Sequence, residues 1–192
     1  MAQTFSLAHL TADLCSPQQL VEIAAGAGYD HVSFRMTPVT ESEKVHPLIH
    51  NRKLMQETLE RLDGTGLDVL DVELVRMDSE TRPEQYGALL DAAAQLGARA
   101  VICQLPDSDQ QRATEKFAEL CDLALPYNLG IALEFVSWTD TPDLGAAGHI
   151  ITTADRVNGG LLIDTLHFDR SASSLDDLEK VPRSWFQFVH LC

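Results

Sequence analysis

The stretch Gly-Leu-Leu-Ile-Asp-Thr-Leu-His, residues 160–167, is a short apolar run that stops at an aspartate, with a histidine three residues later. An apolar run of this length is typical of a strand buried in a parallel sheet. Two other runs show the same pattern, in which a polar side chain stands near the end of an apolar run. They are Ile-Ala-Leu-Glu-Phe, residues 131–135, and Phe-Val-His, residues 188–190. We therefore predict three strands that each carry one metal-competent side chain near the carboxyl end. These side chains are Glu134, Asp164 and His190.

Outward from these runs, strand and helix patterns alternate along the chain. We predict strands over Thr4–His9, Tyr29–Phe34, Leu67–Val75, Arg99–Gln104, Ile131–Phe135, Gly160–Asp164 and Trp185–Leu191. We predict helices that begin at Ser16-Pro17 and then over Asn51–Leu62, Pro83–Leu96, Asp109–Leu125, Asp143–Val157 and Leu175–Lys180. Such alternation implies a parallel sheet with right-handed crossovers. Six units and a seventh strand, without Gly-x-Gly-x-x-Gly after the first strand, favour an α/β (β/α)8 TIM barrel over a doubly wound sheet.

The composition excludes several classes of partner. The 192 residues carry a formal net charge of -15, and no basic patch is evident, so we expect no binding to nucleic acid or to anionic membranes. The four cysteines form no metal-binding or disulfide framework, which favours reduced thiols and a cytoplasmic location. No signal peptide or membrane-spanning run is evident. We expect a small-molecule substrate as the partner, and a homo-oligomer stays open.

The three polar side chains converge if the strands form a barrel, because the carboxyl ends of parallel strands meet at one mouth. Two carboxylates and an imidazole suit Mn²⁺, Mg²⁺ or Co²⁺, with Zn²⁺ less favoured, and leave positions open for substrate oxygens. Taken singly, a carboxylate at a strand end is more often a solvated loop residue or a helix cap. The recurrence of a metal-competent side chain at the ends of three successive strands favours the metal site.

These residues also carry a resemblance to a known family. Residues 132–135, 158–167 and 188–192 together resemble the xylose-isomerase-like barrels, and the likeness runs from the first strand to the last residue. That family includes sugar-phosphate isomerases and epimerases, inosose dehydratase and 3-dehydroshikimate dehydratase. The resemblance implies that Glu134 is a metal ligand and a proton-transfer group. It also implies that Asp164 and His190 are ligands and that His167 faces the substrate.

The chain departs from the family pattern at one point. In the family a fourth ligand, normally glutamate, ends strand eight, and this sequence reaches Cys192 without such a strand. We therefore expect residues 1–192 to be a single barrel domain that is truncated at its C-terminus. Two alternatives are that another chain supplies the missing strand of the barrel and that the barrel is open.

Further residues are candidates for contact with the substrate. Arg35 and Arg76 follow strands two and three, where a guanidinium can hold a carboxylate or phosphate. Surface arginines that pair with local acids are an equally good interpretation. The other candidates are His9, Gln104 and Trp138. Glu73, within strand three, would need a partner if it points into the barrel. The long loop from Arg35 to His50 follows a strand, so we expect it over the catalytic face.

Three functions stay open. The leading hypothesis is a metal-dependent isomerase or epimerase of a small sugar, sugar phosphate or hydroxy-ketone that forms an enediolate, with Glu134 and His167 as catalytic residues. The second is a metal-dependent dehydratase of the 3-dehydroshikimate or inosose type on the same fold. The third is a non-catalytic binding module or inactive fragment. A DNA-repair endonuclease is disfavoured because it would need more histidine ligands and a basic groove.

Overall fold

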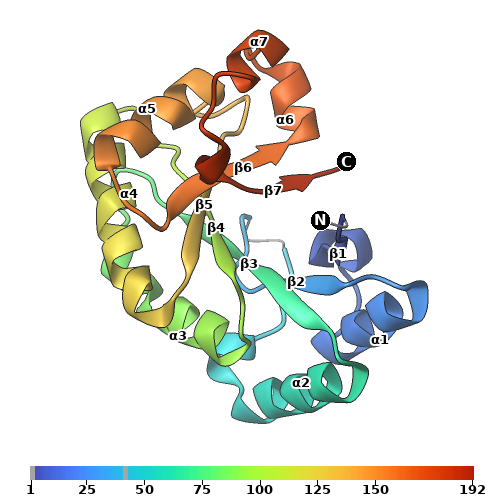
Figure 1. The fold of residues 1–192 in the computed structure, drawn as a ribbon. Coiled ribbons are helices and arrows are strands. Elements are labelled where there is room, and N and C mark those ends of the chain that lie inside the picture. Colours follow the sequence, from blue (N-terminus) through green and yellow to red (C-terminus); the bar gives the residue numbers. More distant parts are fainter. Residues whose placement is uncertain (1–2, 41–42) are drawn as a thin grey trace.

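The computed structural model describes residues 3–40 and 43–192, and in these residues strands alternate with helices (Figure 1). The strands are β1 (Ser6–Leu7), β2 (His31–Arg35), β3 (Asp68–Arg76), β4 (Ala100–Gln104), β5 (Gly130–Glu134), β6 (Gly159–Asp164) and β7 (Phe186–His190). The α-helices are α1 (Pro17–Ala27), α2 (Arg52–Thr65), α3 (Gly87–Gln95), α4 (Gln110–Ala124), α5 (Leu144–Ala154), α6 (Thr165–Arg170) and α7 (Leu175–Leu178). Short 3-10 turns are η1 (His9–Ala12), η2 (Leu48–His50), η3 (Pro83–Tyr86), η4 (Leu125–Tyr127) and η5 (Arg183–Trp185).

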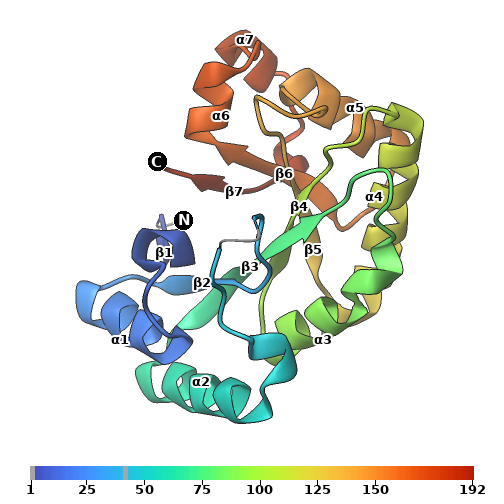
Figure 2. The ribbon, with the colours of Figure 1, turned by 180° about the vertical axis from the view of Figure 1, so that it is seen from behind.

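The described strands form one seven-stranded sheet in the order β1-β2-β3-β4-β5-β6-β7, and each neighbouring pair is parallel. The sheet curls into an open half-barrel whose outer face is covered by the helices, as both views show (Figures 1 and 2). β1 and β7 are its two edges. The architecture confirms the predicted α/β barrel class.

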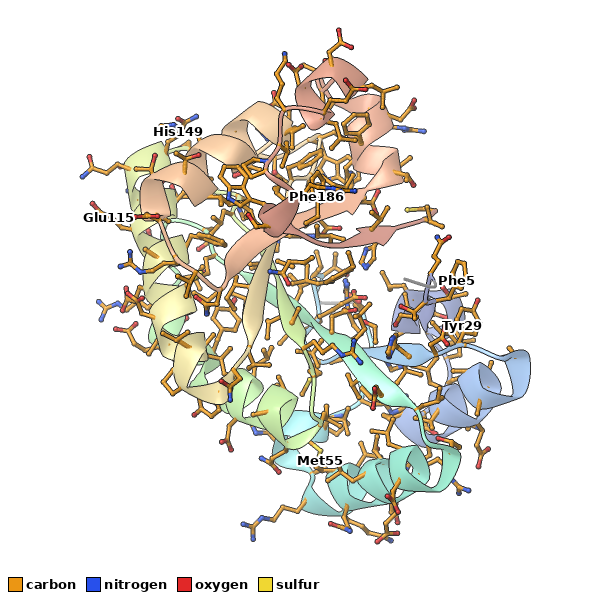
Figure 3. The ribbon with its side chains drawn as sticks, in the orientation of Figure 1. Phe5, Tyr29, Met55, Glu115, His149 and Phe186 are labelled. Atoms are coloured by element: carbon orange, nitrogen blue, oxygen red, sulfur yellow. The ribbon has the colours of Figure 1, made fainter. Side chains whose placement is uncertain are left out.

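Two hydrophobic clusters occupy the two faces of the sheet. The larger cluster lies between the sheet and the helices and includes alternate strand residues such as Val75, Cys103 and Leu133. The smaller cluster lies inside the curl and contains Leu74, Ile102, Ala132 and Leu162, with Phe188 packed against it. Side chains at the surface of the helices point away from both, as Glu115 and His149 do (Figure 3).

Local signals explain most element boundaries. Ser16 caps α1 through a reciprocal pair of hydrogen bonds with Gln19, and Pro17 stands at the first helical position, as predicted. Gly28 ends the helix with a φ of 81°. The second helix runs three residues beyond its predicted end at Leu62, because the residue that adopts the left-handed conformation is Gly66, with a φ of 72°.

The structure bears on two expectations from the sequence, which concern membrane-spanning helices and the state of the cysteines. Within residues 3–40 and 43–192, no helix combines the length and apolar character needed to cross a bilayer. All four cysteines are free thiols. Burial raises the pKa of Cys121 to about 12, and the charge of Asp122 adds to this effect.

Gly160 allows β7 to lie close against β6. A Cβ at this position would collide with the backbone oxygen of Trp185, and it would lie 2.7 Å from Nε2 of Gln187. We expect Gly160→Ala to lower the free energy of unfolding by about 1–3 kcal/mol, the usual cost of overpacking. Chemical denaturation measures this change.

Gly64→Ala is the matched control. Gly64 is exposed within α2 and nothing lies within 4 Å of its added Cβ, so alanine there is expected to stabilise the protein by about 0.4–1 kcal/mol. A Gly160→Ala protein as stable as the parent would contradict the close packing of β6 and β7.

Candidate functional site

Three polar side chains meet at one rim of the sheet. Glu134, Asp164 and His190 are the last residues of β5, β6 and β7, which are neighbours in the sheet. His190 Nδ1 lies 3.7 Å from Glu134 Oε1 and 3.9 Å from Asp164 Oδ2. Both carboxylates are buried, whereas the imidazole is half-buried. The residues proposed from sequence as metal ligands are therefore brought together, and their role as ligands stays a prediction.

Asp164 links the end of β6 to the start of α6. Its Oδ1 accepts hydrogen bonds from the backbone N–H groups of Leu166, at 2.8 Å, and His167, at 3.0 Å. Asp164 is thus the N-cap of α6, so residues 165–167, to which the sequence assigned no element, form the first turn of a helix. The Asp-x-x-His spacing thereby turns His167 back toward the aspartate.

His167 belongs to the same cluster as the two carboxylates. Metal-competent atoms of Glu134, Asp164 and His167 lie within 4.8 Å of one another, and all three residues are buried. His167 Nδ1 is buried and has no hydrogen-bond partner in the described residues. The Trp138 ring lies edge-on to the imidazole, with centroids 4.7 Å apart, and its indole is 70% exposed. A buried imidazole nitrogen without a partner fits a bound ligand or substrate oxygen at this point.

Gln104, the last residue of β4, contacts Glu134 from the neighbouring strand, on the side away from β6. Its Nε2 donates a hydrogen bond of 2.6 Å to Glu134 Oε2. We predicted Gln104 as a substrate contact from sequence. In the structure its amide contacts a carboxylate, as groups around a metal ligand commonly do, and its role as a substrate contact stays a prediction.

A second group of acids, inside the curl beneath the rim, includes a residue that sequence reasoning missed. Asp71, Glu73 and His190 place metal-competent atoms within 4.8 Å of one another. Ser33 Oγ donates a 2.6 Å hydrogen bond to Asp71 Oδ2. Asp71 alternates with Glu73 in the Asp-Val-Glu run of β3, and this spacing was the available signal that both acids share one face.

The pKa values of this group are shifted by their surroundings. Burial and the charge of Glu73 raise the pKa of Asp71 to about 7, against the hydrogen bond from Ser33 and the charge of His190. Burial lowers the pKa of His190, but contact with Glu134 and the charges of Asp71 and Glu73 outweigh it, so this pKa is raised. Asp71 beneath the rim and His190 at the rim thus both have raised pKa values.

Arg35 is held by two carboxylates. Its Nη1 lies 2.5 Å from Glu73 Oε2, and its Nε lies 2.7 Å from Glu43 Oε1. Glu73 therefore has the partner that its burial requires. Glu43 brings part of the predicted Arg35–His50 loop back to the rim, while residues 41–42 of that loop lie outside the described residues.

Both ring nitrogens of His9 are occupied. Nδ1 accepts a 3.2 Å hydrogen bond from the backbone N–H of Arg35, and Nε2 lies 3.1 Å from the carbonyl oxygen of Cys15. Burial lowers the pKa of His9, although the Cys15 contact opposes this. A neutral imidazole that donates from Nε2 satisfies both contacts, so His9 joins η1 to β2 and has no ring nitrogen left for a substrate.

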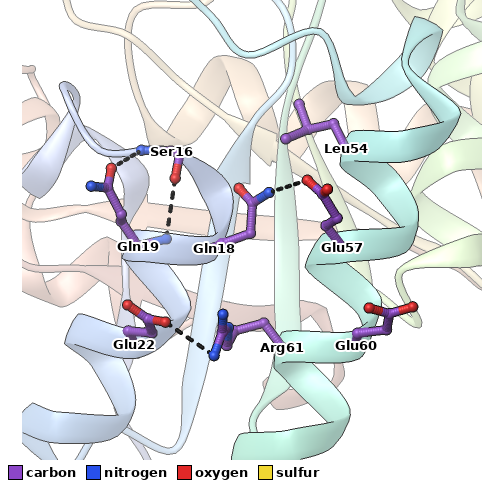
Figure 4. A pocket seen from close by; sticks show the side chains of 8 residues that line it. All are labelled: Ser16, Gln18, Gln19, Glu22, Leu54, Glu57, Glu60 and Arg61. Atoms are coloured by element: carbon purple, nitrogen blue, oxygen red, sulfur yellow. Dashed lines mark hydrogen bonds and ion pairs between the residues drawn. The ribbon is translucent and has the colours of Figure 1, made fainter.

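A polar groove lies elsewhere, between α1 and α2 (Figure 4). Gln18 Nε2 donates a 3.0 Å hydrogen bond to Glu57, and Arg61 lies 3.1 Å from Glu22. These contacts join two helices on the outer face. The groove shares no lining residue with the rim cluster.

Comparison with known proteins agrees with this architecture. Residues 21–192 match the family described as xylose isomerase-like TIM barrel. An inosose isomerase of Bacillus licheniformis is 29% identical in an alignment over 118 residues, and the match covers 56% of this chain and 42% of that protein. One of Bacillus velezensis is 24% identical in an alignment over 187 residues, and the match covers 91% of this chain and 66% of that protein. The chain thus spans less than two thirds of the length of these curated relatives.

Two solved structures share the fold. The zinc-bound crystal structure of the IolI protein matches with a TM-score of 0.79 and 20% identity, over 98% of this chain and 72% of that chain. The probable 3-DHS dehydratase AsbF of Bacillus anthracis matches with a TM-score of 0.77 and 16% identity, over 98% and 72% of the two chains. At these identities the likeness is evidence for the fold alone.

The raised pKa of Asp71 predicts a pH-dependent effect of Asp71→Asn on the metal-free protein. Because the pKa is about 7 when folded and 3.8 ordinarily, this carboxyl destabilises the fold progressively as pH rises between these values. Asparagine keeps an acceptor for Ser33 and removes the ionisation. We expect the variant to gain stability over the parent by up to ~1.4 kcal/mol per pH unit in that window.

Urea denaturation at a series of pH values, with a chelator present, measures the gain. It should be absent near pH ~4 and level above pH ~7. Asp91→Asn, at an exposed position of α3, is the control and should show no such profile. A gain that is the same at every pH would contradict the assignment.

Proposed function

This chain belongs to the xylose isomerase-like TIM barrel family, and on that premise we propose that it is a divalent-metal-dependent isomerase or epimerase of a small sugar, sugar phosphate or hydroxy-ketone. The observation that carries the proposal is the convergence of Glu134, Asp164 and His190 at the rim. The inosose isomerase relatives support the reaction class.

Glu134, Asp164 and His190 would hold the metal. Two carboxylates with an imidazole form a donor set for Mn²⁺, Co²⁺, Mg²⁺ or Zn²⁺, and the unpartnered His167 nitrogen beside them fits a site that takes a further ligand. When bound, the metal supplies positive charge that stabilises negative charge on neighbouring substrate oxygens. Since the related IolI structure contains zinc, Zn²⁺ belongs in any titration together with the three metals favoured from sequence.

The residues of the chain would then move the proton that leaves carbon. Glu134 takes this proton from the carbon next to the substrate carbonyl, the C–H electron pair forms a carbon–carbon double bond, and the carbonyl π pair moves onto oxygen to give an enediolate. His167 donates a hydrogen bond to that oxygen from its free ring nitrogen. Gln104 keeps the Glu134 carboxylate oriented. Return of the proton to the former carbonyl carbon, with transfer of the hydroxyl proton to the enediolate oxygen, gives an isomer. Protonation of the original carbon on its opposite face gives an epimer and needs a second acid on that face.

The substitution Glu134→Gln tests this role. It keeps the side-chain volume and removes the charge, so we expect metal-supported turnover of inosose and ketose substrates to fall by at least about a hundredfold. Coupled assays or proton exchange by NMR measure turnover, and calorimetric titration measures metal affinity.

Glu115→Gln is the control, since Glu115 is exposed on the outer surface of α4 (Figure 3). It should leave turnover and metal affinity unchanged. Full metal-supported activity in Glu134→Gln would remove Glu134 from the mechanism.

A dehydratase is the second candidate, supported by the fold shared with AsbF. The first step is the same proton transfer, after which loss of a β-hydroxyl as water yields an enone. Incubation with inosose and 3-dehydroshikimate distinguishes the two, because an enone or catechol product gives a new ultraviolet absorbance. An isomerase is expected to give none, and an absorbance increase that requires the metal would favour the dehydratase.

A further inference from the structure

Arg76 is a half-buried arginine at the rim for which the described residues provide no acidic partner. We infer that it binds an anionic group of the substrate, so that the substrate is a polyhydroxylated compound that carries a carboxylate or a phosphate. The inference deepens the proposed function and rests on it.

The direction of Arg76 follows from its neighbours on β3. Val75 and Met77 are both fully buried in the cluster between the sheet and the helices. Side chains alternate along a strand, so Arg76, between them, faces the inside of the curl. Its partner in the sheet register is Gln104. The guanidinium therefore stands on the same face as the Gln104 amide that contacts Glu134.

The pairing of the other arginines makes Arg76 distinctive. Three further arginines are half-buried, and each has a carboxylate within 3 Å. They are Arg35 with Glu43 and Glu73, Arg112 with Asp107, and Arg156 with Asp122. In residues 3–40 and 43–192, the Arg76 guanidinium has no hydrogen bond or ion pair, and the Tyr86 hydroxyl bonds only to the backbone of Arg76.

A partly buried cation with an unused planar set of donors is suited to an external anion. Guanidinium groups bind carboxylates and phosphates through two parallel hydrogen bonds. Arg35 is not available for this purpose, because Glu43 and Glu73 already occupy its nitrogens. Of the two arginines that the sequence offered as candidates for binding an anion, Arg76 is therefore the one whose guanidinium is not already paired.

The placement also limits the size of the substrate. β3 and β5 are separated by β4 alone, so the backbones of Arg76 and Glu134 are two strand spacings apart, roughly 10 Å. With both side chains directed inward, the space between the guanidinium and the reacting carboxylate suits one small ring or a short carbon chain. His167, on the β6 side of Glu134, would then contact the oxygen being transformed.

Three cyclohexane polyols test the inference on the metal-loaded protein: neutral myo-inositol, quinate with a carboxylate, and myo-inositol 1-phosphate. Calorimetry should give at least about tenfold tighter binding for one of the two anionic compounds, the difference expected for a charged hydrogen bond. The tighter anion identifies carboxylate or phosphate as the group recognised. Arg76→Gln should abolish the preference, and Arg76→Lys should retain part of it.

Arg183→Gln is the matched control, because Arg183 is exposed in η5 at the opposite ends of the strands. It should keep the preference, and thermal unfolding should show Arg76→Gln to be folded. Equal affinity for the three compounds, no binding of either anion at millimolar concentration, or a preference that survives in Arg76→Gln would overturn the inference.

If neutral ketoses are turned over without any anion preference, this inference alone fails. If the preference exists without metal-dependent turnover, the proposed reaction fails while Arg76 keeps its role.

Discussion

Parallel pairing from β1 to β7 is the constraint on which the site depends. It places the last residue of every strand at one rim, so residues far apart in sequence meet without any dedicated loop. Glu134, Asp164 and His190 are such terminal residues, and so are Gln104 and Arg76. Asp164 adds a second function, since its carboxylate also begins α6 and so orients His167. One backbone pattern and one capping carboxylate therefore generate most of the cluster.

The inside of the curl combines apolar and polar side chains. An apolar cluster with members from β3 to β7 lies inside the curl, whereas β2 and β3 also contribute Ser33, Arg35, Asp71 and Glu73. Buried charges are costly unless they are paired, and here Arg35 is paired with Glu73 while Asp71 is hydrogen-bonded to Ser33. The polar groups continue to the rim at Arg76. The inside of the curl thus offers a ligand both apolar side chains and hydrogen-bonding groups.

Sequence patterns predicted the features that depend on nearby residues. The strands, the Ser16-Pro17 helix start and the glycine helix ends are local signals, and the structure confirms them within a few residues. The helix at residues 165–170 was missed because its start depends on how the Asp164 side chain folds back. Asp71 was missed because its partner Ser33 lies 38 residues away in the sequence. Pairing of Arg35 with a local acid, here Glu43, was one of the interpretations left open, whereas its contact with Glu73, 38 residues away, was not foreseen.

The two tryptophans stand in contrasting places. Trp138 is largely exposed at the rim against His167, whereas Trp185 lies in η5, before the first residue of β7. An adjacent imidazole alters indole fluorescence, and it does so more strongly when it is protonated. Trp138 is therefore a natural optical reporter of events at the mouth.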